Sequence, residues 1–312
     1  MPNTDLNPSV VVPAEQWQQL AQSHENRVGA YTDPLVQLHK RGVKHPVYDF
    51  LFSYYYLSAG ALKRWNPGAG IVVANPDKNA AAPHADWKFY REVSPDTAAD
   101  LPHGGWTVDL EKFGAQRARV LEFASRLLSA TAARPAKLSC FGLHEWAMAY
   151  KAEDHGIRHS TVPLRLGAEG TNEVVETHKI SCSHFDAFRF YAPEARGMNQ
   201  LQPTRDTMIE MEQPGCLHAN MDLYKWATKL IPAVSSDLVT DCFELAWDIR
   251  VMDMQASPYD LADWGFDPIA IETAEGKAEY VRAQRDFSER SQVLRRRLLD
   301  SIERISSCLQ TS

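Results

Sequence analysis

The sequence lacks the motifs that identify the common nucleotide-dependent and hydrolytic enzymes. It contains no Gly-x-Gly-x-x-Gly fingerprint, no Walker loop, no Gly-x-Ser-x-Gly elbow and no paired Cys-x-x-Cys motif. Each of these patterns serves one chemistry, because it sets backbone N–H groups, a nucleophile or thiolate ligands at a fixed spacing. Their absence argues against nicotinamide enzymes, nucleoside triphosphatases, serine hydrolases and zinc fingers.

Long apolar runs are also missing, and none approaches the roughly 18–20 residues that a membrane-spanning helix needs. Residues 1–13 carry neither a basic start nor a long apolar stretch. We therefore predict no secretory signal and no membrane contact, and we expect a cytoplasmic location. In that compartment the five cysteines are expected to be free thiols or ligands rather than disulfides.

Positive charge is in short supply. The formal net charge is −7, which argues against a broad phosphate-binding face. A contact with nucleic acid through a local basic cluster stays open, and the chain has two such clusters, at residues 39–45 and 295–297. For the second cluster we predict solvated charges on a helix.

The composition is that of a folded globular protein. The chain has 312 residues, of which 44% are hydrophobic and 23% charged. That length can bury a sizeable core. We predict a flexible tail at residues 1–13 and a single, large, mostly α domain with minor β structure at residues 14–312.

Hydrophobic spacing and capping residues predict the individual elements. Helices are expected over residues 14–40 with a break at Pro34, and over 46–65, 116–132, 143–153, 217–230, 235–255 and 274–308. One short strand is expected at residues 71–74, followed by a long loop over 74–105. Residues 179–191 fit a helix and a strand about equally. The charged C-terminal helix is expected either to pack internally or to pair with a second chain.

The first group of polar residues that suits catalysis lies in the segment from Cys140 to Trp146. His144 and Glu145 are adjacent, so on a helix they point about 100° apart and do not bind one metal ion from the same face. The segment is not a His-Glu-x-x-His motif, because position 148 is Met. A packed histidine with a backbone partner is the alternative.

His184 and Asp186 form the second group. They are two residues apart, so on a strand both side chains would lie on one side. A carboxylate beside an imidazole raises its basicity, fixes its tautomer or joins it as a metal ligand. Arg189 offers Asp186 a structural ion pair instead.

The third group opens a helix after Pro214-Gly215. His218 and Asp222 are spaced i and i+4, so they share one face of that helix. Asn220 lies near the helix start, where free backbone N–H groups bind anions. Lys225 and Lys229 lie on the same face, so ion pairs with Asp222 are the structural alternative.

Carboxylates also form a stripe along the predicted helix 235–255, at Asp237, Asp241, Glu244 and Asp248. The rest of that helix is apolar over much of its circumference. We predict that the stripe is its solvated face, because a buried unpaired carboxylate costs several kcal/mol.

Four longer segments together resemble a known family. They are residues 44–55 (KHPVYDFLFSYY), 140–148 (CFGLHEWAM), 182–190 (CSHFDAFRF) and 213–226 (QPGCLHANMDLYKW). In these segments the chain resembles a group of actinobacterial proteins commonly labelled 3-methyladenine DNA glycosylase. The resemblance extends over roughly residues 17–299.

The resemblance implies hydrolysis of an N-glycosidic bond to a damaged base or a nucleoside-like substrate. Such enzymes need a carboxylate near the sugar and aromatic walls for the base. Asp186 or Asp222 would stabilise the cationic sugar, and His184 or His218 would transfer protons, with His144 and Glu145 as further catalytic candidates. The candidates for substrate binding are Tyr54, Trp146, Arg189, Asn220 and Trp226. Residues 67–70 spell the Pro-Gly-x-Gly turn of a DNA-binding helical hairpin, but no second helix is predicted after them.

Two alternatives remain at this point. In the first, His184, Asp186, His218 and Asp222 bind iron, manganese or zinc, and the protein is a metal-dependent enzyme acting on a small molecule. In the second, the aromatic residues form a ligand-binding site without catalysis.

Overall fold

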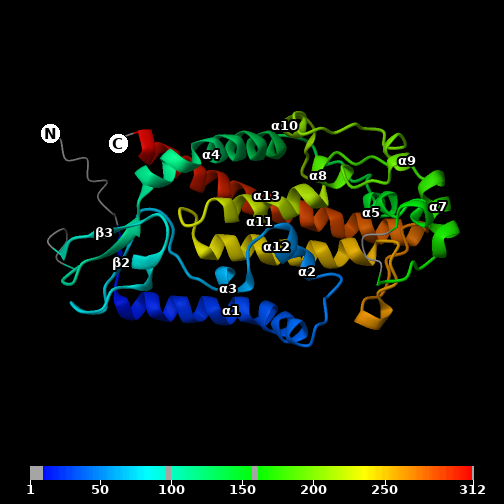
Figure 1. Ribbon diagram of the computed structural model, residues 1–312. Helices are drawn as coiled ribbons and strands as arrows, with labels where there is room; N and C mark the ends of the chain where they lie inside the picture. Colours follow the sequence, from blue (N-terminus) through cyan, green and yellow to red (C-terminus); the bar gives the residue numbers. More distant parts are fainter. Residues whose placement is uncertain (1–9, 96–99, 157–160, 311–312) are drawn as a thin grey trace.

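The protein is described by a computed structural model that covers residues 10–95, 100–156 and 161–310. The observed elements confirm the mostly α fold with minor β structure. Helices α11 (Leu217–Lys229), α12 (Ser236–Gln255) and α13 (Ala274–Gln310) run side by side, with α4 (Leu110–Ala132) on one side and α1 (Ala14–Lys40) on the other (Figure 1).

The central layer forms because α12 is apolar nearly all round. Its buried side chains include Leu238, Phe243 and Ile249, and they join the largest apolar cluster of the chain. The Ser235 side chain accepts a hydrogen bond from the Leu238 N–H and so caps the helix, as its sequence predicts. Helix α13 packs against α4, α11 and α12, so it is an internal helix of this chain.

A four-stranded sheet lies at one end of the helices (Figure 1). Its strands are β1 (Val10–Val12), β2 (Ile71–Ala74), β3 (Tyr90–Val93) and β4 (Gly105–Val108), in the order β1-β2-β4-β3. Strands β1 and β2 are parallel, and the other neighbours are antiparallel. Strand β2 was predicted. Strand β1 lies inside the predicted tail, and β3 lies inside the predicted loop.

Short helices between α4 and α11 in the chain carry His144, Glu145, Trp146 and Asp186 among the predicted site residues. They are α5 (Leu143–Met148), α6 (Ala152–His155), α7 (Gly167–Thr177), α8 (Phe185–Phe188), α9 (Pro193–Arg196) and α10 (Met208–Met211). The remaining elements are α2 (Asp49–Tyr54), α3 (Ala59–Leu62) and the single turns η1 (Pro83–Asp86) and η3 (Ala262–Trp264).

Several predicted boundaries are wrong for local reasons. Helix α1 continues through Pro34, because Pro34 and Ala30, whose carbonyl the proline leaves unpaired, both lie on its exposed face. The predicted helix 46–65 is divided into α2 and α3 at Tyr56, which has a φ of +55°. The predicted helix 143–153 is likewise divided before Lys151, which has a φ of +52°. Helix α4 begins at Leu110, earlier than predicted, because the Asp109 side chain caps it.

The polar clusters on α12 and α13 differ in outcome. The acidic stripe is the solvated face of α12, as predicted, where Asp241 and Glu244 pair with Arg27, and Asp248 pairs with Arg290. The prediction for residues 295–297 is wrong at Arg295. Its guanidinium is fully buried and donates to Asn220 Oδ1 over 2.8 Å, because α13 turns this side toward α11.

Candidate active site

A pocket of about 770 Å³ opens beside the second half of α11. Helix α11 forms one wall, and α4, the turn after α2, the end of α8 and the segment that leads into α10 contribute the others. Its lining residues are Ser53, Tyr54, Tyr55, Tyr56, Leu57, Arg117, Phe123, Asp186, Arg189, Phe190, Arg205, Met208, Lys225, Trp226, Thr228 and Lys229. The lining is therefore rich in aromatic and charged side chains.

Positive charge dominates the pocket although the chain as a whole is acidic. Among the described lining residues, three arginines and two lysines face a single carboxylate, that of Asp186. Such a concentration of one sign of charge in a concave site raises the local concentration of oppositely charged small molecules. The pocket therefore suits an anionic ligand with an aromatic part.

Asp186 lies between two of these cations. Its Oδ2 accepts a hydrogen bond from Lys225 Nζ over 2.8 Å, and its Oδ1 lies 3.2 Å from Arg189 Nε. Burial opposes ionisation of this carboxyl, but the Lys225 ammonium outweighs it and lowers the pKa of Asp186. The side chain is thus a carboxylate at neutral pH. It can stabilise a cation or accept a proton, and it is not suited to donate one.

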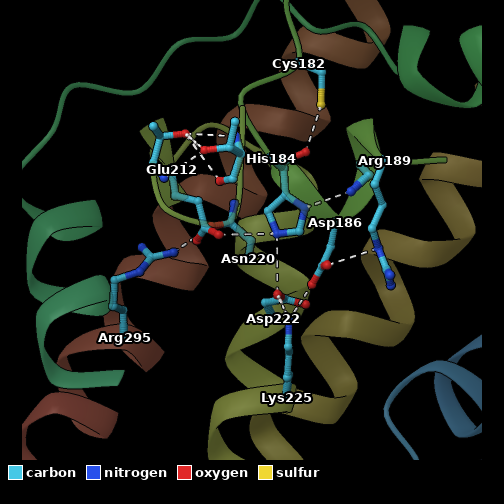
Figure 2. A network of polar contacts seen from close by, with 12 residues as sticks. Cys182, His184, Asp186, Arg189, Glu212, Asn220, Asp222, Lys225 and Arg295 are labelled. Carbon is cyan, nitrogen blue, oxygen red and sulfur yellow. Dashed lines mark hydrogen bonds and ion pairs between the residues drawn. The ribbon is translucent and has the colours of Figure 1, made fainter. Parts of the chain in front are cut away.

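Lys225 links the pocket to a buried network (Figure 2). Its Nζ also donates to Asp222 Oδ2 over 2.8 Å, and the Tyr55 hydroxyl donates to Asp222 Oδ1 over 3.2 Å. Asp222 is buried, and despite that burial the Lys225 ammonium holds the pKa of Asp222 well below its usual range. The carboxylate at this position is therefore fixed in its charged form.

The His184 ring lies between Asp222 and Glu212 (Figure 2). Its Nε2 lies 3.4 Å from Asp222 Oδ2 and 3.5 Å from Glu212 Oε1. Its Nδ1 caps α8 by accepting from the Ala187 N–H over 3.3 Å, so the proton of a neutral ring is on Nε2. Burial lowers the pKa of His184, but the two carboxylates outweigh it and raise that pKa to about 8.

Glu212 is the second carboxyl group beside His184. Burial raises its pKa to about 7, with the His184 ring acting in the opposite direction. The pKa of Glu212 is therefore raised, whereas the pKa of Asp222, the other carboxyl beside His184, is lowered.

A second group lies deeper, where α5, α11 and α12 meet. His144 Nε2 lies 2.9 Å from Asp253 Oδ1, and the His218 ring packs edge-on against His144 with ring centres 4.5 Å apart. Glu145 points away from His144 and accepts from Arg250 Nη1 over 2.9 Å. The divergence of His144 and Glu145 was predicted from their adjacency.

The structure distributes the predicted catalytic residues between these two groups. Asp186 lines the pocket, and Asp222 and His184 lie directly behind it. His144, Glu145 and His218 belong to the deeper group. The His184 and His218 rings connect the two groups, with centres 5.4 Å apart. His184 and Asp186 are not on a strand, because the segment turns into α8 at His184.

The predicted substrate-binding residues also separate. Tyr54, Arg189 and Trp226 line the pocket. Trp146 is fully buried in the core and its indole N–H donates to the Ala256 carbonyl. Asn220 is buried too, where it donates to the Pro214 carbonyl and accepts from Arg295, so it joins α11 to α13 away from the pocket.

The predicted metal-binding set is not gathered around one point. Asp186 is bound by Lys225 and Arg189 at the pocket wall. Within the described part of the chain, the group of three side chains whose ligand atoms come close enough for one ion is His144, His218 and Asp253. One signal in the sequence could have identified Asp253, because it is a carboxylate between two methionines on an apolar helix and lies off the acidic stripe.

Other functional candidates were missed because no local pattern marks them. Arg117, Arg205 and Tyr56 reach the pocket from segments that are distant in sequence. Glu212 immediately precedes the third group but was not included in it.

Comparison of the chain with protein-family models, with curated proteins and with solved structures gave no match. No helix in the described residues is both long and apolar enough to cross a membrane. The function therefore has to be argued from the site.

Proposed function

We propose that the protein hydrolyses the N-glycosidic bond of a small, anionic, nucleotide-like substrate in the pocket beside α11. The observation that supports this proposal most directly is a single ionised carboxylate, Asp186, in a pocket walled by aromatic rings and cations. The resemblance to proteins labelled as DNA glycosylases suggests the type of bond.

Each part of a nucleotide has a chemical counterpart in this pocket. Arginine and lysine bind phosphate through charge-assisted hydrogen bonds, and Arg117, Arg205 and Lys229 line the pocket without an ion pair to its carboxylate. Aromatic side chains stack on the face of a base, and Tyr54, Tyr56, Phe190 and Trp226 line the pocket. A volume of about 770 Å³ is within the range of small-molecule sites.

Asp186 would act on the sugar. Cleavage of such a bond passes through a state with positive charge at C1′, which a nearby carboxylate stabilises. The C1′–N bond breaks with its electron pair going to the base, and water adds at C1′. The proton that the water loses is taken up by the departing base, so the reaction balances, and Asp186 stays ionised throughout.

The buried residues behind Asp186 would position it. Lys225 holds the Asp186 carboxylate at 2.8 Å, and Asp222 holds Lys225 in turn at the same distance. Because Asp222, His184 and Glu212 are buried, we assign them to positioning and to the charge balance of Lys225, not to contact with substrate.

Base release is the direct test. The full-length protein is incubated with purine and pyrimidine nucleoside 5′-monophosphates, with the matching nucleosides and with alkylated DNA, and free base is quantified by chromatography. We expect release from monophosphates, and a loss of at least about 100-fold in kcat for Asp186→Asn. Asp237→Asn, a carboxylate on the exposed start of α12, is the matched control.

The three substrates give separate answers. Release of base from alkylated DNA alone would show that the substrate is a polymer and not a nucleotide. Release from nucleosides alone would show that the cations of the pocket do not bind a substrate phosphate. No release from any substrate, or full activity in a folded Asp186→Asn variant, would reject the proposal.

A further inference from the structure

The deeper polar group has a composition that the proposed function does not use. His144 on α5, His218 on α11 and Asp253 on α12 each direct a ligand atom to one point, and these atoms all lie within 4.8 Å of one another. All three side chains are buried. We propose that they bind one divalent first-row transition metal ion, of the iron, manganese or zinc class.

The separations suit such an ion. Ligand atoms at about 2.0–2.2 Å from a metal are about 3 Å apart at right angles and about 3.4 Å apart in a tetrahedron. His144 Nε2 and Asp253 Oδ1 are 2.9 Å apart, which matches neighbouring positions on one ion. The His218 ligand atom lies within 4.8 Å of the other two.

The donor set selects among ions. Two imidazoles and one carboxylate on three separate elements are typical of sites for iron, manganese or zinc, whereas magnesium and calcium prefer oxygen donors only. Three protein ligands also leave further positions on the ion for water or a small ligand.

Each of two ligands has an outer partner that fixes its orientation, as metal ligands in proteins usually have. The second ring nitrogen of His144, Nδ1, lies 3.4 Å from Cys140 Sγ, so Nε2 faces the site. The second oxygen of Asp253 lies 3.5 Å from Arg250 Nη1, and Arg250 is itself fixed by Glu145.

His218 has no other explanation on structural grounds. Its ring packs against the His144 and His184 rings and, among the described residues, takes part in no hydrogen bond or ion pair. A buried imidazole without a polar partner carries a desolvation cost. Coordination to a metal would offset that cost.

Metal content tests the inference without any substrate, so its result is independent of the proposed function. The untagged full-length protein is produced with iron, manganese and zinc in the medium and analysed by inductively coupled plasma mass spectrometry. Metal-free protein is then titrated with Co²⁺ and its visible absorption recorded. We expect about one equivalent of one metal and a cobalt spectrum typical of nitrogen and oxygen ligands.

Four variants make the result specific. His218→Ala and Asp253→Asn should each lower metal affinity by at least about tenfold. His84→Gln, which alters another buried histidine far from this group, and Asp186→Asn, which alters the pocket carboxylate, should keep the full equivalent. Circular dichroism identifies any variant that fails to fold. If Asp253→Asn is misfolded, the metal content of His218→Ala, which breaks no ion pair, tests the proposed site.

The inference is overturned by less than about 0.1 equivalent of every metal in wild-type protein together with no cobalt spectrum. It is equally overturned if folded His218→Ala retains the wild-type metal content. Loss of metal in Asp186→Asn would move the site to the pocket and contradict the assignment.

Discussion

Two polar regions lie along helix α11, and they differ in their exposure to solvent and in the pairing of their charges. The pocket beside its second half is open and has a surplus of positive charge, and Arg189 there is 46% exposed. The interior group at its start is sealed, and each charge in it has a partner: His144 with Asp253 and Arg250 with Glu145, all with exposures of 7% or less. The two regions share one helix and one histidine contact, but the first is open and the second is buried.

Because of this difference, removal of a charge should affect ligand binding in the pocket and the stability of the fold in the interior. A surplus charge in an open pocket is solvated, so its removal changes affinity for an anion and leaves the fold nearly unchanged. A paired charge in a dry interior is neutralised only by its partner, so its removal leaves the other charge uncompensated. The same type of substitution should therefore have opposite consequences in the two regions.

The largest effect is expected for Arg250→Met. The Arg250 guanidinium is buried, pairs with Glu145 and Asp253, and lies over the Phe50 ring. Its loss leaves two carboxylates buried without it, and we expect the free energy of unfolding to fall by about 3–5 kcal/mol. Urea denaturation followed by circular dichroism at neutral pH measures this change.

Arg205→Met is the matched control, because Arg205 is an exposed arginine of the pocket wall. It should change the free energy of unfolding by less than about 0.5 kcal/mol. Equal urea midpoints for the two variants would show that the interior charges are not sealed from water, and the comparison would collapse.

A buried histidine without a carboxylate sharpens the comparison. His84 is 1% exposed among Trp17, Trp65 and Trp87, and within the described ranges its side chain has one polar contact, with the Trp65 carbonyl. Burial lowers its pKa from 6.5 to about 4, whereas the carboxylates beside His144 and His184 raise theirs. The fold thus favours the neutral form of His84.

The sign of the pH effect follows from this shift. At neutral pH His84 is neutral in both states and costs nothing. As the pH falls from 6.5 to about 4, the unfolded chain gains a proton that the folded chain does not, and stability falls by about 3 kcal/mol. Urea midpoints at neutral pH and at about pH 4 should therefore differ less for His84→Gln than for wild type. An unchanged difference would contradict the assignment.

The helices of the central layer were predictable, because a hydrophobic pattern with helical spacing over many residues fits only a helix. Helices α11, α12 and α13 begin and end within a few residues of their predicted bounds. Strands β1 and β3 were not predictable, because each is short, and β1 also depends on β2, a partner far along the chain. The break at Tyr56 depends on a left-handed residue that no sequence signal marks.

The site was predictable where one segment carries it. Asp186, Arg189, Asp222 and Trp226 came from two short segments, and Lys225 was expected as an ion-pair partner of Asp222, as found. Asp253 and Arg205 reach their groups only through tertiary packing, so spacing within a helix could not identify them. Trp146 was predicted to bind substrate because it lies close to His144 in the sequence, but it is a residue of the core.

The smallest effect is expected at the pocket rim, where binding and stability oppose each other in one residue. Tyr56 is 91% exposed and has a φ of +55°, a conformation that costs a side chain about 1 kcal/mol and costs glycine little. Both Tyr56→Gly and Tyr56→Ala remove a stacking surface and should weaken nucleotide binding about tenfold, measured by calorimetry. Only Tyr56→Gly also relieves the backbone, so it should be more stable than Tyr56→Ala by about 1 kcal/mol. Equal stability of the two variants would show that the backbone at Tyr56 is not strained. Unchanged affinity for the nucleotide would show that Tyr56 is not part of the binding surface. The two variants therefore test the two roles of this residue separately.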